Sequence, residues 1–267
     1  REKGIGAYMF RETFSFYMLS RFFDRAYTKP RGYAGDFFTI EMIYNDESAG
    51  DGRLGRFIDR WGLDSAASTA VKNRRKLLTS AIQDIARGRS GQTTLVTSLA
   101  CGPAREIIDL FQGDDAPDVK ATCIDIDNQA LSYVAGLCEL HNLRDRISLA
   151  QDNVLRMCRG KGKTVLKPQH MVYTIGLIDY LQDDQVVGLL NWMHDCLEPG
   201  GTVVVGNFGK DNVDKSFMDH VLEWVLLHRD ENDLQAIFAR SKFGGSPVKV
   251  VKEPAGVNLF AFCQRLG

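Results

Sequence analysis

The sequence predicts an α/β fold in which a mostly parallel sheet follows an N-terminal helical region. From residue 92 onward, apolar β-branched segments alternate with amphipathic ones, as strands and crossover helices do in a parallel sheet. Residues 1–90 lack strand patterns and space their apolar side chains as helices do. Gly91 lies in a polar run between the two patterns. We therefore expect a helical lid or substrate region over 1–90 and a sheet domain over 91–267.

Each element of the sheet domain is bounded by its own turn or cap. Apolar runs ended by Gly, Pro, Asp or Asn predict seven strands, near residues 94–100, 120–125, 146–150, 169–175, 201–207, 247–252 and 257–264. Amphipathic segments between them predict helices near residues 104–112, 128–141, 183–197, 213–228 and 231–240.

The first strand ends in a turn of small residues that leads directly into a helix. This turn, residues 100–104 (Ala-Cys-Gly-Pro-Ala), lies where an open α/β sheet presents the amides of a helix N-terminus to a ligand. It lacks the three glycines of the dinucleotide fingerprint, and the chain has no phosphate-loop motif. The turn therefore predicts a site for a nucleoside without phosphates, with S-adenosylmethionine (SAM) as the candidate.

Polar side chains end the second and third strands. Asp125 directly follows an apolar run, where a carboxylate reaches both ribose hydroxyls of a bound nucleoside; capping of the turn is the alternative. Asp127 is placed to cap the next helix. Asp152 and Asn153 follow the third strand, where the alternatives are recognition of the adenine edge and formation of a turn.

The ends of the fourth and fifth strands face the same edge of the predicted sheet. Gly176 lets the backbone approach a ligand closely. Asp179 and Tyr180 follow it at the mouth of the same crevice, and the fifth strand ends at the polar Asn207.

The N-terminal region is dense in aromatic residues between positions 8 and 27. This composition favours helices packed on the main domain, part of whose surface lines an acceptor pocket. A loop at 29–38, broken by one proline and two glycines, carries Arg31, Tyr33 and Asp36 and is expected to act as a lid or substrate clamp. The basic run 72–76 is interpreted as a solvated helix face.

The composition excludes several classes of function. A net charge of -1 gives no indication of a nucleic-acid partner. Six cysteines without a C-x-x-C pair and five histidines without metal spacing argue against a disulfide framework and a metal site. No apolar run is long enough for a membrane span and no secretory signal is recognisable, so we expect a cytoplasmic protein. Its partner is expected to be a small-molecule acceptor, with a homodimer as one option.

These motifs, taken in order, resemble those of class I SAM-dependent methyltransferases over roughly residues 90–265. The carriers are Leu-Ala-Cys-Gly-Pro-Ala-Arg-Glu at 99–106, Ile-Asp-Ile-Asp at 124–127, Asp-Asn at 152–153 and Leu-Glu-Pro-Gly-Gly at 197–201. More narrowly, segments 31–36, 101–106, 175–181 and 206–208 are similar to the bacterial family of extracellular-factor (3-hydroxypalmitic acid methyl ester) biosynthesis methyltransferases. The resemblance implies a Rossmann-like sheet, SAM as cofactor with S-adenosylhomocysteine as product, and a role in bacterial secondary metabolism.

The first motif departs from the usual acid followed by Gly-x-Gly-x-Gly. Ser98 stands at the acidic position, and Ala100 and Ala104 replace two of the glycines. The usual acid holds the methionine ammonium, so that role is expected to pass to another residue, with Asp36 and Asp179 as candidates.

The resemblance and the strand-end positions together nominate the site residues. The cofactor-binding candidates are Ser98, Ala100, Cys101, Gly102, Asp125, Ile126, Asp152, Asn153, Thr174 and Gly176. The catalytic candidates are Tyr33, Asp179 and Tyr180, and the substrate-binding candidates are Arg31, Tyr33, Asp36 and Asn207.

No histidine falls at a strand end of these motifs, so the chain offers no evident general base. A carboxylate acceptor is already ionised at neutral pH and needs none. We therefore expect O-methylation of the carboxylate of a small or fatty hydroxy acid, with Arg31 pairing with that carboxylate. The alternatives are a SAM-consuming cyclase or lyase that releases methylthioadenosine, and a non-catalytic SAM-binding module.

Overall fold

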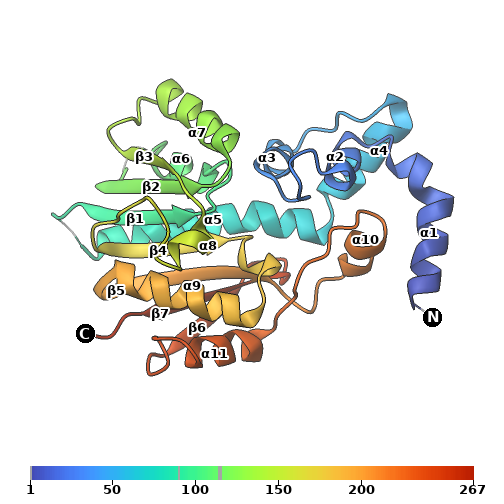
Figure 1. Ribbon diagram of the computed structural model, residues 1–267. Coiled ribbons are helices and arrows are strands. Elements are labelled where there is room, and N and C mark those ends of the chain that lie inside the picture. The colour runs from blue at the N-terminus through green and yellow to red at the C-terminus, as the bar shows by residue number, and fades with distance from the viewer. Residues whose placement is uncertain (1, 90, 114–115) are drawn as a thin grey trace.

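The computed structural model describes residues 2–89, 91–113 and 116–267, and it begins with five helices (Figure 1). These are α1 (Glu2–Tyr17), α2 (Arg21–Thr28), α3 (Phe37–Asn45), α4 (Gly52–Leu63) and α5 (Ala66–Arg87). Side chains of Ser20, Asp36 and Ser65 accept amide hydrogen bonds at the starts of α2, α3 and α5 and so fix where these helices begin.

The rest of the chain forms one seven-stranded sheet with helices between the strands. The strands are β1 (Thr94–Leu99), β2 (Val119–Asp125), β3 (Ile147–Gln151), β4 (Gln169–Ile175), β5 (Leu197–Phe208), β6 (Val248–Lys252) and β7 (Asn258–Gln264). The connecting elements are α6 (Arg105–Leu110), α7 (Asn128–Leu140), α8 (Val154–Met157), the 3-10 helix η1 (Ile178–Tyr180), α9 (Asp183–Cys196), α10 (Lys215–His220) and α11 (Glu231–Ala239).

The strand order is β3-β2-β1-β4-β5-β7-β6. Strands β1 to β5 pair in parallel, and β7 runs antiparallel to both β5 and β6. The predicted fold class, a mostly parallel sheet of seven strands, is confirmed. The order reverses between β1 and β4, and ligands of open α/β sheets bind beyond the carboxyl ends of the strands at such a point.

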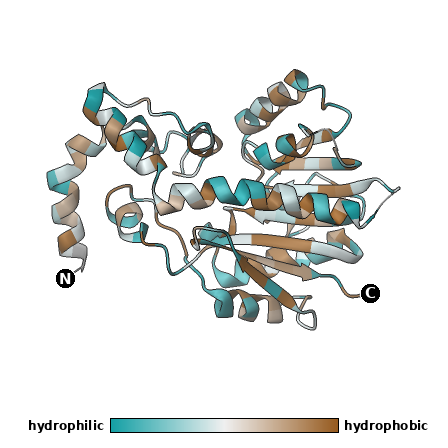
Figure 2. Ribbon diagram, turned by 180° about the vertical axis from the view of Figure 1, so that it is seen from behind, coloured by the Kyte–Doolittle hydropathy of each residue, from teal (hydrophilic) through white to brown (hydrophobic). Residues whose placement is uncertain are grey.

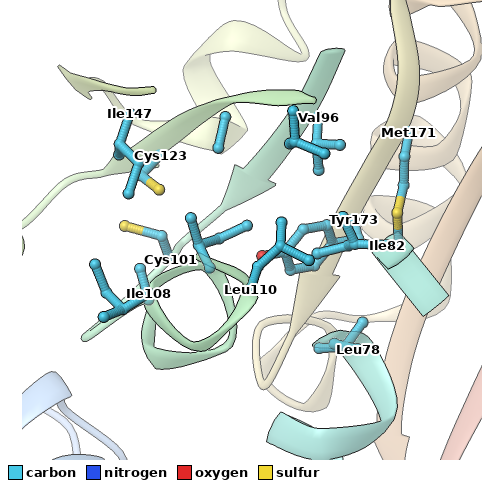
Figure 3. Close-up of a cluster of buried hydrophobic side chains, with 14 of the residues drawn as sticks. Leu78, Ile82, Val96, Cys101, Ile108, Leu110, Cys123, Ile147, Met171 and Tyr173 are labelled. Atoms are coloured by element: carbon cyan, nitrogen blue, oxygen red, sulfur yellow. The ribbon is translucent and has the colours of Figure 1, made fainter. Parts of the chain in front are cut away.

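Helices cover both faces of the sheet. On one face α5 lies along the strands, as the view from behind shows (Figure 2), and α6 and α7 pack beside it. Leu78 and Ile82 of α5 meet Tyr173 of β4 in this core (Figure 3), and all three side chains are fully buried. On the other face α8, α9 and α11 cover a second core built on β4 and β5. Burial of these apolar side chains holds the layers together.

A third core joins the N-terminal helices to the segment after β5. Phe22 and Phe23 of α2, Ile43 of α3 and Val71 of α5 pack with side chains from residues 208–226. In Figure 1 the helices α2, α3 and α4 lie together at one end of the sheet domain, and α5 connects the two parts. This arrangement places the N-terminal region over the carboxyl ends of the strands.

One predicted helix is wrong in extent. The sequence predicts a helix over 213–228, but α10 covers only Lys215–His220, and residues 223–230 carry no regular secondary structure. The backbone amides of Leu227 and Arg229 donate to the carbonyls of Asp179 and Phe208, at 2.7 and 3.0 Å, so long-range partners replace the helical ones. The fifth strand is also longer than predicted, beginning at Leu197.

None of the described helices is both long enough and apolar enough to cross a lipid bilayer.

Candidate active site

A cavity of about 380 Å³ opens at the carboxyl ends of β1, β2 and β4. Its floor is formed by the turn after β1 and the ends of β2 and β4, and its cover by residues of the 33–40 segment together with Trp224 and Leu226. A volume of this size is typical of sites for small molecules. The sheet therefore presents a ligand-sized space at its switch point.

The turn after β1 has an alternating left-handed backbone. Ala100, Gly102 and Ala104 have φ values of 51°, 53° and 47°. This conformation is open to glycine, whereas each alanine in it costs about 1 kcal/mol. The two alanines therefore keep the geometry that glycines would adopt, and the strain is held at the cavity wall.

Asp125 fixes this turn and faces the cavity. Its Oδ2 accepts the amide hydrogen of Gly102 at 2.8 Å, and its Oδ1 accepts that of Asp127 at 2.9 Å. Burial raises the pKa of the Asp125 carboxyl, while these amide hydrogen bonds oppose the rise. Two amides leave part of the hydrogen-bonding capacity of a carboxylate unused. Ile126 lines the same part of the cavity.

Beyond β4, Gly176 and Asp179 reach the cavity from the opposite side. Gly176 has a φ of 76°, which favours glycine. Asp179 is 2% exposed, and its Oδ1 accepts the amide hydrogen of Phe208 at 2.7 Å. Burial raises the pKa of Asp179 to about 6, even though that hydrogen bond and the charge of Arg74 favour the ionised form. Asp179 therefore changes charge near neutral pH.

Three aromatic side chains bound the part of the cavity beside Asp179. Trp224 Nε1 donates to the hydroxyl of Tyr180 at 2.9 Å, and the rings of Tyr33 and Tyr180 meet edge to face at 6.4 Å. Burial raises the pKa of both phenols, so both hydroxyls keep their protons at neutral pH. The cavity thus contains two hydroxyl donors next to a buried carboxyl.

The structure brings nine of the nominated residues to this cavity. They are Tyr33, Ala100, Cys101, Gly102, Asp125, Ile126, Gly176, Asp179 and Tyr180. Their roles toward a ligand stay predictions.

Four nominated cofactor residues lie outside the cavity lining. Ser98 is buried in β1, and Thr174 donates to the carbonyl of Leu99. Asp152 accepts the amides of residues 163 and 164 at 2.6 and 2.8 Å, and Asn153 caps α8. At 152–153 the geometry is that of a turn and cap, and the Asp152 carboxylate is used within its own loop.

The nominated substrate residues other than Tyr33 are also engaged within the protein. Arg31 forms a bidentate pair with Asp127 and contacts Gln129, which ties the 29–36 loop to the start of α7. Asp36 is fully buried, caps α3 and pairs with Arg25 at 2.6 Å.

Asn207 is likewise buried, donating to two carbonyls and accepting from Arg229. Of the two acids expected to replace the usual first-motif acid, the structure therefore brings Asp179 and not Asp36 to the cavity.

Two charged residues that sequence reasoning did not nominate line the cavity. Arg74 is 6% exposed, so the interpretation of 72–76 as a solvated face is wrong at this position. Glu106 is 2% exposed, and its Oε1 accepts the hydroxyl hydrogen of Tyr173 at 2.7 Å. The signal for Arg74 was its spacing, since it follows Ala70 and Val71 by four and three residues on the apolar face of a helix.

Among the described residues no three potential metal ligands cluster.

The family of the chain follows from a match that covers two thirds of it. Residues 32–212 match the model of a family described as "Putative methyltransferase". The chain belongs to this methyltransferase family. No curated protein matches it.

Solved structures, among them two methyltransferases, share the fold. A possible exported protein from Bordetella parapertussis is similar, with a TM-score of 0.70, 16% identity, and coverage of 100% of this chain and 97% of the other. Magnesium protoporphyrin IX methyltransferase from Synechocystis PCC 6803, crystallised with S-adenosylhomocysteine, gives a TM-score of 0.59 at 11% identity, over 91% and 97% of the two chains. The SAM-dependent methyltransferase SibL gives 0.57 at 18% identity, over 92% and 70%. Together with the family match, the shared fold makes this chain a class I methyltransferase.

Proposed function

We propose that this methyltransferase uses SAM to O-methylate the carboxylate of a small or fatty hydroxy acid. The observation that carries the proposal is the cavity at the switch point of the sheet. A turn with glycine-like backbone, the Asp125 carboxylate with its remaining acceptor capacity, and two tyrosine hydroxyls line this cavity. The ester-forming family indicated by segments 31–36 and 175–181 supports the same acceptor class.

The residues present fit the cofactor at its nucleoside end. Asp125 retains acceptor capacity for ribose hydroxyls, Ile126 offers an apolar surface, and an added Cβ at Gly102 would find its nearest neighbour only at 3.9 Å, so the turn leaves room for a ligand. The adenine would need partners other than Asp152, whose carboxylate is occupied. When bound, SAM supplies an electrophilic methyl group on a sulfonium.

The chemistry of the walls supports a carboxylate acceptor. Methyl transfer to a carboxylate releases no proton, so the protein needs only to align the acceptor and exclude water. The protonated hydroxyls of Tyr33 and Tyr180 can donate to the acceptor carboxylate. Asp179 accepts a hydrogen bond from the acceptor's own hydroxyl, which distinguishes a hydroxy acid from a plain one. The apolar part of the acceptor would lie against Phe208, Trp224 and Leu226, which line the cavity.

The first experiment identifies the nucleoside formed from SAM by mass spectrometry, with and without hydroxy acids of graded chain length and with a blank lacking enzyme. We expect S-adenosylhomocysteine and a methyl ester only when an acid is present. Methylthioadenosine formed without any acceptor would replace this proposal by a SAM cyclase or lyase. Cofactor binding without either product would make the chain a binding module.

A second experiment tests the role of Asp179 in acceptor choice. The wild-type protein is expected to prefer a hydroxy acid to the unsubstituted acid of equal length, and Asp179→Asn to lose most of that preference. Tyr180→Phe is the matched control, because it removes a hydroxyl that is proposed to contact the carboxylate common to both acids. An unchanged preference in Asp179→Asn would contradict the assignment.

A further inference from the structure

Arg74 is a buried cation that forms no ion pair with any described carboxylate. Neighbouring arginines are paired: Arg75 with Asp109 and Arg105 with Glu41. No carboxylate of the described residues lies within 4.0 Å of the Arg74 guanidinium, and its Nε has no hydrogen-bond partner. A buried guanidinium left in this state is costly, and a bound anion relieves the cost. Arg74 lines the cavity, so an anionic ligand could reach it.

The surroundings of Arg74 define a distinct end of the cavity. Its Nη1 lies 3.3 Å from the position of an added Cβ on Gly176, at the end of β4, and its charge opposes the rise that burial causes in the pKa of the Tyr44 hydroxyl. The aromatic group formed by Tyr33, Tyr180 and Trp224 lies elsewhere, next to Gly35, where an added Cβ would lie 2.9 Å from the Tyr180 hydroxyl and 3.0 Å from Trp224. The cation and the hydroxyl donors therefore occupy separate parts of one space.

Glu106 supplies the opposite charge at the Arg74 end. Its carboxyl is buried and lines the cavity; burial raises its pKa, whereas the hydrogen bond from Tyr173 and the charge of Arg74, which is not in ion-pair contact with it, favour the ionised form. It comes from α6, which packs directly on α5. One positive and one negative group, held apart on two packed helices, are the complement of an amino-acid zwitterion.

We infer that Arg74 binds the α-carboxylate of the methionine part of the cofactor, and that Glu106 receives its α-ammonium group. The inference rests on the proposed use of SAM, a nucleoside whose anionic group is this carboxylate. A guanidinium can bind a carboxylate through two parallel hydrogen bonds, and the free Nε of Arg74 provides one of the donors. The usual first-motif acid, whose position Ser98 takes in this chain, would hold that ammonium group. We assign its role to the carboxyl of Glu106.

The test compares two ligands that differ only in the amino-acid part. Isothermal titration calorimetry is carried out with S-adenosylhomocysteine and with methylthioadenosine, which lacks both the carboxylate and the ammonium. We expect Arg74→Gln and Glu106→Gln to weaken binding of S-adenosylhomocysteine by roughly tenfold or more. Their affinity for methylthioadenosine should stay within about twofold of wild type, and Arg74→Lys should recover part of the loss.

The matched control is Lys76→Gln, which removes the same charge from an exposed position two residues further along α5. It should change neither affinity, and circular dichroism with thermal melting verifies that each variant is folded. Equal loss of both ligands in Arg74→Gln would assign Arg74 a purely structural role. Unchanged binding of both, with a raised KM for the acid, would assign it to the acceptor. A wild-type protein that binds neither ligand would overturn the proposed function itself, and this inference with it.

Discussion

At the scale of single residues, the site is built from groups held in unfavourable states. Alanines occupy left-handed backbone at 100 and 104, Asp179 is a carboxyl buried near an aromatic wall, and Arg74 is a buried cation whose Nε has no hydrogen-bond partner among the described residues. Such features persist only where the surrounding structure over-determines them, and they gather at functional sites. Here they all belong to one cavity or to the turn that forms its wall.

The strain at Ala100 can be released without changing the fold. In Ala100→Gly the relief of the left-handed alanine exceeds the entropy lost by glycine on folding, so the free energy of unfolding should rise by about 0.5 kcal/mol. Urea unfolding without ligand measures it. Ala150→Gly is the control, because Ala150 is half-buried in β3 and has an ordinary φ. This substitution should lower the free energy of unfolding by about 1 kcal/mol. A free energy of unfolding lower in Ala100→Gly than in wild type would contradict the prediction that Ala100 is strained.

Asp179 gives stability a defined dependence on pH. Its pKa of about 6 in the folded protein lies above the usual value of an unfolded aspartate, so the folded state binds more protons between about pH 4 and pH 6. Its contribution to stability is therefore fully present below pH 4 and is lost as the pH rises through 6. Asp179→Asn should match wild type near pH 4 and exceed it by about 3 kcal/mol at pH 7.

Urea unfolding of both proteins across this range isolates the effect, because all other titrating groups are common to the two. The substitution keeps an oxygen that can accept the amide hydrogen of Phe208. A constant difference between the two proteins from pH 4 to pH 8 would contradict the raised pKa.

At the scale of elements, the sequence pattern predicts the strands and the central helices, because hydrophobic periodicity reports directly on burial. The pattern does not predict which hydrogen-bond partners the polar groups find in the folded chain. The segment after α10 is apolar enough for a helix, yet the backbone amides of Leu227 and Arg229 hydrogen-bond to the carbonyls of Asp179 in η1 and Phe208 in β5.

The candidate site residues were misjudged for the same reason. Asp36, Asp152 and Asn207 look like free polar groups in the sequence, whereas each is hydrogen-bonded to amides, carbonyls or an arginine of other segments. Arg74 stands in a basic run of which Lys76 is exposed and Lys72 and Arg75 are half-buried in ion pairs, so the run does not show which of its cations is buried.

The side chain of Arg229 holds the segment after α10, residues 223–230, beside the cavity. It is 4% exposed and donates to the carbonyls of Ile178 and Leu181, to Asn207 Oδ1 and to Asp183. Arg229→Gln should lower the free energy of unfolding by about 3 kcal/mol, because several buried acceptors lose their donor at once. Urea unfolding measures it.

The control is Arg240→Gln, whose pair with Asp184 is exposed and should contribute less than about 0.5 kcal/mol. Similar small effects for both variants would show that the network around Arg229 does not hold the loop.

At the scale of the whole molecule, two hydrophobic cores meet within one helix. Val71 of α5 packs with the N-terminal helices, whereas Leu78 and Ile82 pack under the sheet. The sequence pattern changes near residue 91, but the cores change between residues 71 and 78. The cavity lies at this junction, with its floor on the sheet and its cover on the N-terminal region. A ligand there contacts both cores, so it should couple them.

Hydrogen exchange measures that coupling. The N-terminal cover is joined to the sheet domain by side-chain packing and ion pairs, whereas β4 is hydrogen-bonded to a strand on each side, so amides of α3 should exchange by a lower-energy route than those of β4. A ligand that binds only the closed form raises the free energy of that opening by mass action. Saturating S-adenosylhomocysteine should therefore slow exchange in α3 and in the turn at 100–104, while the centre of β4 changes little. Equal slowing in all elements would mean that the molecule opens as a single unit, and that the N-terminal region is no separate cover.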